Sequence, residues 1–471
     1  MSVHPSGSRD AAEPLDARVS PLRSPWFAVV VLFGMNLLNY IDRYVFFSAG
    51  PKISEELTFS DSQFGILSIA FMVVYTIVSP FVGWLGDRYN RRRLIAFGVA
   101  LWSLATVGTA FSSGFYDMFF WRALLGIGEA SYGVIAPALL ADLFPPKRRG
   151  PVMGLYYLAL PLGGAIGYLV GGWFAAHEWR HAFYVVGIPG MVAAFAGLLM
   201  HDPGRGASEG RSDLNAVRPK MSDYLEMLIT PSFLWNTAGQ AAVTFAIGAY
   251  AVWGSTFYQR VRGFDSKEAG AVIGAITAGA GLFGIILGTW ISDRWSRYSR
   301  RALLLWPGVA VLLAAPMGTM AILAPERTVS LGFLFAASLL MASVLGPSNT
   351  VTANVVAANR RAAGYAMCIF LVHLFGDISS PALVGAIADH FGTPAAAESS
   401  VGRFFASIGA VPTMSPTGPS NLTLGMLIVV PTLVLGAFFF FLGARTLPRD
   451  QDRAQSAPGG GPIEPGGFVG H

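Results

Sequence analysis

Long apolar segments separated by short polar ones dominate the pattern along this chain. An α-helix needs about 20 apolar residues to cross ~30 Å of hydrocarbon. A window of that length predicts twelve membrane-spanning helices, at residues 26–48, 62–86, 92–112, 117–143, 151–175, 182–201, 232–257, 268–292, 301–323, 328–356, 363–388 and 422–444. Because twelve is an even number, both ends of the chain are expected on the same side of the membrane.

The polar segments differ in how many basic residues they contain. Segments 87–93, 144–150, 202–230, 293–301 and 357–362 hold 17 Lys and Arg, whereas the alternate segments hold seven. Loops rich in Lys and Arg remain in the cytoplasm. The sequence therefore predicts that both termini are cytoplasmic.

The longest of the basic segments divides the chain into two halves of six predicted helices each. The termini are polar and rich in Pro, Gly and Ser, a composition typical of disorder. The expected organisation is a disordered tail at 1–20, an N-terminal half at 21–201, a linker at 202–230, a C-terminal half at 231–447 and a second disordered tail at 448–471.

Composition narrows the class of protein further. The chain is 53% hydrophobic and 13% charged, whereas a soluble domain carries about 25% charged residues. The single cysteine, Cys368, excludes a disulfide framework. There is no phosphate-binding loop, metalloprotease helix or nucleophile elbow. An all-α membrane protein that is not an enzyme, with no catalytic, metal or cofactor site and no nucleic-acid partner, is expected.

A short motif recurs in the two halves, as "GWLGDRYNRRR" at 83–93 and "TWISDRWSRYSRR" at 289–301. It resembles the motif between the second and third helices of the major facilitator superfamily of transporters. The resemblance implies a fold of two six-helix repeats and a cytoplasmic gate formed by Gly83, Asp87, Arg88, Arg91 and Arg92, with Asp293 and Arg294 in the second copy. We expect Asp142 to pair with Arg88 or a neighbouring arginine. The alternative is a signal for membrane topology alone.

A second pattern of this superfamily lies in the fifth predicted helix. It is similar to the glycine-rich motif of the antiporters, although Tyr168 stands where that motif has proline. Small residues at this spacing allow helices to approach closely and pivot. The predicted hinge glycines are Gly154, Gly163, Gly167, Gly171 and Gly172. Glycine-rich packing without a role in transport is the alternative.

Three longer segments resemble one branch of the superfamily, the Spinster family. They are "NYIDR" at 39–43, "RALLGIGEASYGVIAPALLADLF" at 122–144 and "HLFGDISSPALVG" at 373–385. The resemblance extends from Trp26 to about Leu447. It implies transport of sphingolipids or lysophospholipids.

Few charged residues lie well inside the predicted helices. A charge at membrane depth costs at least ~2.5–3.5 kcal/mol, so these side chains should face the protein interior. From their depths, Asp42 is expected to pair with Arg122, and Glu129 with Arg43 or, after a shift of the helices, with Arg122. Such a network suits proton coupling, with Asp42 as the principal proton acceptor. A fixed structural ion-pair cluster is the alternative.

His373 and Asp377 lie four residues apart, on one face of the eleventh predicted helix. The pair is a candidate second proton relay. The alternative is a simple hydrogen bond between helices.

The predicted cavity is mostly apolar with a few polar points, which suits an amphiphile. We expect a monomeric, proton-coupled lipid transporter of the plasma or inner membrane, working by alternating access. A general exporter of organic anions or drugs and a lipid sensor without transport remain alternatives. The candidate cavity residues are Tyr40, Phe46, Tyr132, Phe245, Tyr250, Trp253, Asn349 and Asn354.

Overall fold

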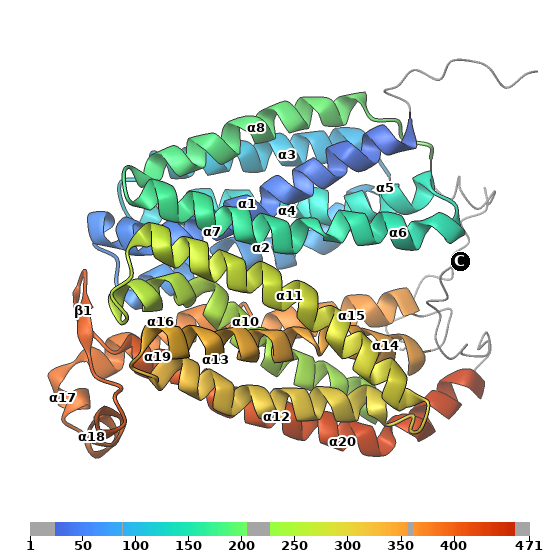
Figure 1. Ribbon diagram of the computed structural model, residues 1–471. Coiled ribbons are helices and arrows are strands. Elements are labelled where there is room, and N and C mark those ends of the chain that lie inside the picture. Colours follow the sequence, from blue (N-terminus) through green and yellow to red (C-terminus); the bar gives the residue numbers. More distant parts are fainter. Residues whose placement is uncertain (1–23, 87, 205–226, 357–360, 457–471) are drawn as a thin grey trace, which may run out of the picture.

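The computed structural model describes residues 24–86, 88–204, 227–356 and 361–456. These residues fold into two bundles of long helices and one short hairpin (Figure 1). The predicted tail at 1–20, most of the predicted linker and Asp87 lie outside the described residues.

The first bundle corresponds to the predicted N-terminal half. Helix α1 begins at Pro25, and the Ser24 side chain caps it by accepting a hydrogen bond from the Trp26 amide. The helix ends at Leu57, because the next residue, Thr58, has a left-handed backbone conformation. The helices are α1 (Pro25–Leu57), α2 (Asp61–Gly86), α3 (Arg91–Thr109), α4 (Phe115–Gly133), α5 (Ile135–Leu143), α6 (Pro146–Tyr157), α7 (Ala159–Ala175) and α8 (Trp179–Leu199).

The second bundle corresponds to the predicted C-terminal half. Its elements are α10 (Pro231–Arg260), α11 (Ser266–Ser296), α12 (Ala302–Leu323), α13 (Arg327–Ala342), α14 (Leu345–Asn354), α15 (Arg361–Phe375), α16 (Ser380–Gly392), α17 (Pro394–Ala397), α18 (Ser400–Ser407), β1 (Thr413–Ser415), β2 (Gly418–Ser420), α19 (Leu422–Leu427) and α20 (Val429–Ser456). Helix α20 runs past residue 448, where we expected the C-terminal tail to begin. Asp450 in this extension is buried and accepts a hydrogen bond from the Ser232 amide.

Five predicted helices are interrupted, giving the pairs α4–α5, α6–α7, α13–α14, α15–α16 and α19–α20. A proline follows each interruption within three residues. Proline lacks an amide hydrogen and clashes with the carbonyl four residues earlier, which breaks the helical ladder at that point. The five prolines are Pro137, Pro161, Pro347, Pro381 and Pro431.

Ten helical stretches of the described chain are long and apolar enough to cross a membrane. Helices α3 and α10, which we also expected to cross, are not among these ten. In α10 the polar side chains of Asn236 and Gln240 are buried, and Asn236 donates to the Ser348 carbonyl oxygen. The polar residues of α10 therefore make contacts inside the bundle, and they lower the mean hydropathy of this helix.

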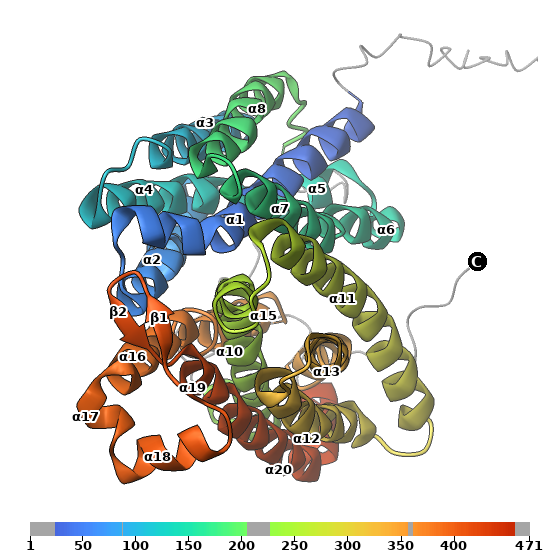
Figure 2. The ribbon, with the colours of Figure 1, turned by 60° about the vertical axis from the view of Figure 1, so that its left-hand side comes forward.

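The two ends of the molecule differ. Antiparallel strands β1 and β2 pair with Met414 opposite Pro419, and they lie with α17 and α18 at one end, here called the hairpin end (Figures 1 and 2). Helix α1 begins and α20 ends at the opposite end, here called the tail end (Figure 1).

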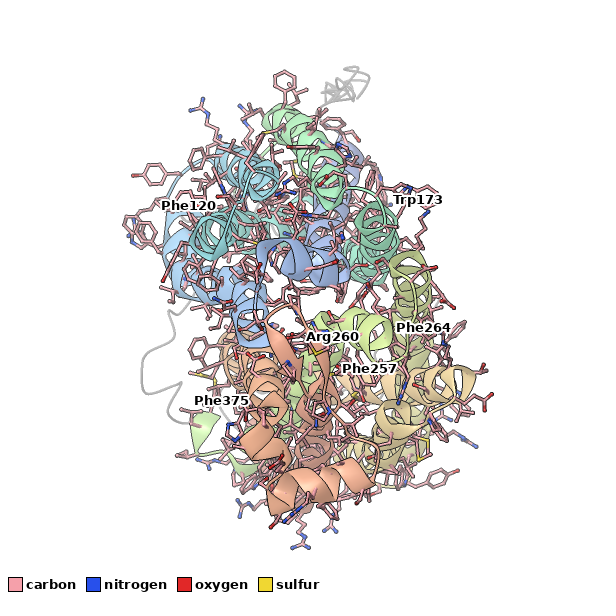
Figure 3. All side chains as sticks on the ribbon, turned by 90° about the vertical axis from the view of Figure 1, so that its left-hand side faces the viewer. Phe120, Trp173, Phe257, Arg260, Phe264 and Phe375 are labelled. Atoms are coloured by element: carbon pink, nitrogen blue, oxygen red, sulfur yellow. The ribbon has the colours of Figure 1, made fainter. Side chains whose placement is uncertain are left out.

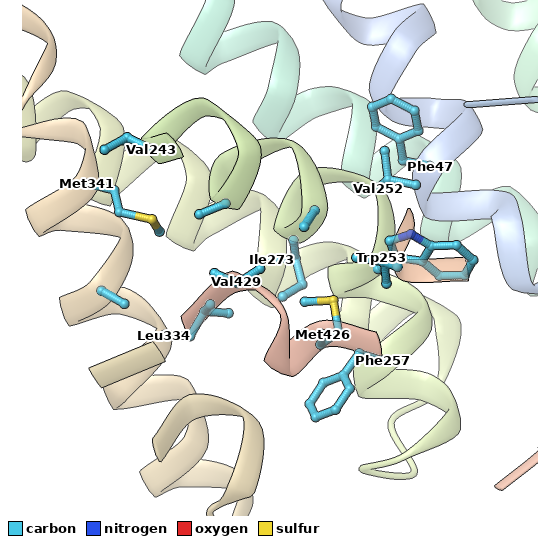
Figure 4. Close-up of a cluster of buried hydrophobic side chains, with 14 of the residues drawn as sticks. Phe47, Val243, Val252, Trp253, Phe257, Ile273, Leu334, Met341, Met426 and Val429 are labelled. Atoms are coloured by element: carbon cyan, nitrogen blue, oxygen red, sulfur yellow. The ribbon is translucent and has the colours of Figure 1, made fainter. Parts of the chain in front are cut away.

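The halves meet through helices toward the hairpin end, where α7 packs against α11, α2 against α16 and α1 against α10. Figure 4 shows Phe47 of α1 beside Val252 and Trp253 of α10. Toward the tail end, the ribbons of the two halves diverge (Figure 1).

Candidate functional site

The charged side chains predicted to face the interior do so. Asp42 and Arg122 are each 1% exposed and Glu129 is 2% exposed, while Arg43 is partly buried. Asp42 and Arg43 lie on α1, and Arg122 and Glu129 lie on α4. The N-terminal half therefore encloses two acids and two arginines.

Arg43 and Glu129 form an ion pair, with 2.8 Å between Nη2 and Oε2. This pairing, expected from the depths of the two residues, is confirmed. The guanidinium of Arg43 also lies over the Phe71 ring, 4.6 Å from its centroid. Because Arg43 retains 20% side-chain exposure, it connects the buried cluster to the surface.

The expected ion pair between Asp42 and Arg122 is not formed in this conformation. Asp42 accepts a hydrogen bond from Thr106 of α3 at 3.0 Å, and Arg122 Nε donates to the Leu67 carbonyl oxygen of α2 at 3.5 Å. Arg122 instead lies over the Phe46 ring, 4.1 Å from its centroid. The two charges still act on each other electrostatically.

Each member of this cluster has one buried polar atom without a hydrogen-bond partner among the described residues. Leaving such a group unpaired costs about 1–3 kcal/mol, more when it is charged. A change of hydrogen-bond partners or the binding of a proton would remove part of this free-energy cost. The atoms are Asp42 Oδ1, Arg43 Nε, Arg122 Nη2 and Glu129 Oε1.

A pocket between the halves adjoins this cluster. The N-terminal half contributes residues of α1 and α2, and the C-terminal half contributes residues of α10, α16 and the turn before α16. Arg43 and Asp377 provide charged groups at its wall, and most of the remaining lining is apolar. The lining residues are Arg43, Tyr44, Phe47, Ser68, Ile69, Phe71, Met72, Thr244, Ile247, Gly248, Ala251, Val252, Asp377 and Pro381.

None of the eight predicted cavity residues lines this pocket. The Tyr132 hydroxyl is bound to the Leu32 carbonyl oxygen, and the Tyr250 hydroxyl to that of Gly318. Phe46 and Trp253 are fully buried in packing. The others also lie elsewhere: Phe245 is buried, Tyr40 and Asn354 are intermediate, and Asn349 is exposed.

The eight residues are chosen by residue type, whereas the lining of this pocket is selected by the way the two halves pack. The α10 lining is an i, i+3, i+4, i+7, i+8 series, which is one stripe of a helix. Gly248 in this stripe packs directly against the Cα and Cβ atoms of Asp377, a contact that the sequence does not indicate.

His373 and Asp377 are in contact, as predicted, with 2.8 Å between Nδ1 and Oδ1. Asp377 lies in the interruption between α15 and α16. The pair has 38% and 22% side-chain exposure, respectively, and Asp377 faces Arg43 from the other side of the pocket.

At the tail end, Arg91 is the centre of an ion-pair network. It is 4% exposed and binds Asp142 of α5 at 2.5 Å and Asp202, just after α8, at 2.6 Å. Burial pushes the pKa of Asp202 upward, but the hydrogen bonds and charge of Arg91 outweigh this and hold that pKa below its ordinary value. Asp142 thus pairs with a neighbour of Arg88, within the N-terminal half.

The other predicted gate residues make local contacts or face outward. Arg88 donates to the Trp84 carbonyl oxygen and lies over the Trp84 ring, and Arg92 donates to the Met200 carbonyl oxygen. A Cβ atom at Gly83 would meet Val134 at an ordinary 3.7 Å. Asp293 and Arg294 of the second copy are exposed.

The glycines of α7 pack on two different helices. Gly163, Gly167 and Gly171 contact the backbone or side chains of α1, whereas Gly172 faces α11, where an added Cβ would lie 2.4 Å from the Ser266 carbonyl oxygen. Gly154 of α6 has no neighbour within 4 Å of an added Cβ. Four of the five predicted hinge glycines therefore allow close helix packing, and Gly154 does not.

Known proteins share both the sequence and the fold. The Major Facilitator Superfamily model matches residues 32–376. Protein spinster of Drosophila melanogaster is 36% identical over 379 residues, covering 78% of this chain and 62% of that protein. Human protein spinster homolog 1 is 34% identical over 392 residues, covering 79% of this chain and 74% of that protein.

Solved structures agree on the fold. A bacterial homologue of the human lysosomal transporter Spinster, in an inward-facing and unoccupied conformation, has a TM-score of 0.79 at 24% identity, over 92% of this chain and 99% of that one. A D-xylose–proton symporter has a TM-score of 0.67 at 15% identity, over 88% of this chain and 96% of that one. The chain is a multi-pass integral membrane transporter and not an enzyme, and it belongs to the Spinster family of the Major Facilitator Superfamily.

Proposed function

We propose that this protein is a proton-coupled secondary transporter that moves an amphiphilic lipid, such as a sphingoid or a lysophospholipid, by alternating access. The observation that carries the proposal is the position of Arg43. It is paired with Glu129 inside the N-terminal half and also lines the pocket between the halves. A substrate in the pocket can therefore act on the buried charges through one side chain.

The membrane topology proposed is twelve spans with the tail end in the cytoplasm. The basic segments support this, because Arg91 and Arg92 begin α3 at the tail end and Arg300 lies there between α11 and α12. The halves touch toward the hairpin end and diverge toward the tail end. The conformation is then open to the cytoplasm, and we place the protein in the plasma or inner membrane as a monomer.

Proton coupling follows from the incomplete pairing of the cluster. Burial favours the neutral form of a carboxyl group, whereas a nearby guanidinium favours the charged form. Asp42 lacks direct contact with Arg122 here, and one of its oxygens has no hydrogen-bond partner among the described residues. Asp42 takes up a proton in this state and releases it when Arg122 moves into contact, so that proton binding and helix movement bias each other.

The pocket lining supports an amphiphilic substrate. Phe47, Phe71 and Val252 offer apolar surface for a chain, and Arg43 offers a guanidinium for an anionic head group. The His373–Asp377 pair on the opposite wall is a candidate second proton relay. No nucleic acid or cofactor takes part.

The tail-end motif and the glycines complete the proposed cycle. The cytoplasmic gate is formed by Arg88, Arg91 and Arg92 when the halves close at the tail end. In the open state, Arg91 is paired with Asp142. Gly163, Gly167, Gly171 and Gly172 allow α7 to slide against α1 and α11.

The test is uptake into vesicles that contain the purified protein. The probes are a fluorescent lysophospholipid in short-chain and long-chain forms and a water-soluble fluorescent organic anion. Uptake that increases with chain length supports the lipid proposal. Uptake that follows charge alone would support the organic-anion exporter instead, and saturable binding without uptake would support a lipid sensor.

A further inference from the structure

A buried acid at the hairpin end joins the two halves. Asp61 begins α2 in the N-terminal half and is 1% exposed. Arg260, the last residue of α10, donates from Nη1 to both carboxylate oxygens at 2.9 and 2.8 Å. Ser420 of β2 is fully buried and donates to Oδ2 of the same carboxylate. Asp61 therefore binds two separate elements of the C-terminal half.

A second acid crosses between the halves in the opposite direction. Asp389 of α16 accepts hydrogen bonds from the amides of Asp61 and Ser62, at 3.2 and 2.8 Å, and from the Ser62 hydroxyl. The first amides of a helix have no partner within it. Ser60 and Gln63 bind each other reciprocally at this terminus. The N-terminus of α2 is therefore capped by two sets of groups, Ser60 with Gln63 from its own half and Asp389 from the other half.

The backbones of α2 and α16 are in direct contact beside these charges. A Cβ atom at Gly65 would lie 2.5 Å from the Pro381 carbonyl oxygen, and one at Gly385 would lie 2.3 Å from the Asp61 carbonyl oxygen. Viewed from the hairpin end, Arg260 lies between the two halves (Figure 3).

An aromatic layer separates this polar cluster from the pocket. Phe64 of α2 stacks on Phe46 with ring centroids 5.3 Å apart and meets Trp253 of α10 edge-on at 5.5 Å. Along α2 the order is Asp61, Phe64 and then the pocket residue Ser68. Along α10 it is Arg260, Trp253 and then the pocket residues. The same order on helices from both halves indicates one continuous closure.

We propose that Asp61, Arg260, Asp389 and Ser420 form a latch that keeps the hairpin end shut in this conformation and comes apart when the pocket opens to that side. This inference rests on the alternating access proposed above. Separation of α2 from α16 and α10 removes the arginine from Asp61 and the cap from the Ser62 amide in one movement. Because Asp61 and Ser420 are buried and the Arg260 side chain is only 11% exposed, these three groups must be rehydrated together, so the latch opens as a unit.

The segment between α16 and α19 positions the serine of the latch. The Asn421 amide donates to the Ala388 carbonyl oxygen, and its side chain donates to that of Ala410. An added Cβ at Gly392 would lie 2.0 Å from the Pro419 carbonyl oxygen. The hairpin is therefore held against the end of α16, which is why Ser420 reaches across to Asp61.

The test measures the distance across the hairpin end without any substrate. Spin labels are attached to cysteines at the exposed positions Glu55 and Met414, in full-length protein carrying Cys368→Ser in lipid nanodiscs. We expect one dominant short distance. Asp389→Asn and Arg260→Gln should each increase the fraction of a longer distance about tenfold, in line with the loss of a differential interaction between two states. Glu398→Gln, an exposed acid on the same segment, should leave the distribution unchanged.

A milder variant guards against misfolding. Ser420→Ala keeps every charge and should raise the longer-distance fraction by about threefold, as expected for one lost hydrogen bond. Distributions of folded Asp389→Asn, Arg260→Gln and Ser420→Ala that match Glu398→Gln would overturn the latch. Since no substrate or pH gradient is used, a shift in distance together with absent lipid uptake would leave the latch in place and refute only the transport proposal.

Discussion

Arg43 of α1 and Glu129 of α4 form an ion pair 2.8 Å apart, and Arg43 also forms part of the wall of the pocket between the halves. The charge of Arg43 at the pocket wall is thus neutralised from within the N-terminal half. Under the proposed function, an anionic head group that reaches Arg43 would compete with Glu129 for the same guanidinium and so link the pocket to the buried cluster.

Removal of one member of this pair should destabilise the protein more than removal of both. Glu129→Gln leaves the guanidinium of Arg43 without its counter-charge, at a cost of about 3–5 kcal/mol, whereas a double change to Arg43→Gln and Glu129→Gln leaves no uncompensated charge. Thermal unfolding in detergent should therefore rank the single variant Glu129→Gln below the double variant. Equal melting temperatures would argue against a tight pair, and Glu55→Gln at an exposed site serves as control.

Acid should weaken the Arg91 network at the tail end. The pKa of Asp202 is held below its ordinary value in the folded protein, so its contribution to stability is present above the unfolded pKa and is lost as pH falls through the folded pKa. In Arg91→Gln this contribution is absent, and the loss of stability between neutral and acidic pH should be smaller than in the wild type. Parallel stability curves for the two proteins would contradict this.

A methyl group at Gly172 should disturb the contact between α7 and α11. The added Cβ would lie 2.4 Å from the Ser266 carbonyl oxygen, and overpacking of this kind costs about 1–3 kcal/mol. Gly172→Ala should lower both the melting temperature and the initial rate of uptake. Gly154→Ala, where nothing lies within 4 Å, should be neutral or slightly stabilising; a similar loss in both variants would refute the packing role.

A large side chain on the pocket face of α10 should block the substrate. Thr244 is half-buried and lines the pocket, so Thr244→Trp should abolish binding of a fluorescent lysophospholipid while the protein remains folded. Asn349→Ala should leave affinity unchanged, because Asn349 is exposed and only its backbone carbonyl accepts a described hydrogen bond, from Tyr365. Reduced affinity in Asn349→Ala with normal affinity in Thr244→Trp would return the site to the cavity proposed from sequence.

The sequence predicted what depends on the membrane and on local chain geometry. The burial of Asp42, Arg122 and Glu129 follows from the cost of charge in hydrocarbon, and the pairing of Arg43 with Glu129 follows from matched depth. The contact between His373 and Asp377 follows from helical spacing. The positions of the helix interruptions do not follow from proline alone, because a proline follows each interruption but Pro51, Pro80 and Pro189 lie inside helices that continue.

Contacts between the halves could not be predicted in this way. In the sequence, Asp61 looks like any acidic residue in the first turn of a helix. Arg260 looks like any basic residue in a loop after a predicted helix. Ser420 ends a strand of three residues, which is too short to show a strand period in the sequence. Their meeting depends on the rigid-body docking of two bundles, as does the choice of the α10 face that lines the pocket.

The proton role of Asp42 is the central claim, and uptake of a lysophospholipid into vesicles with and without an imposed pH gradient tests it most directly. Wild type and Asp42→Asn are compared, with Asp117→Asn as control, because Asp117 is fully exposed and accepts hydrogen bonds from Ser113. We predict that the gradient stimulates uptake by wild type and Asp117→Asn, and that uptake by Asp42→Asn no longer responds to it. An equal response in all three proteins would contradict the account and leave Asp42 as part of a structural cluster.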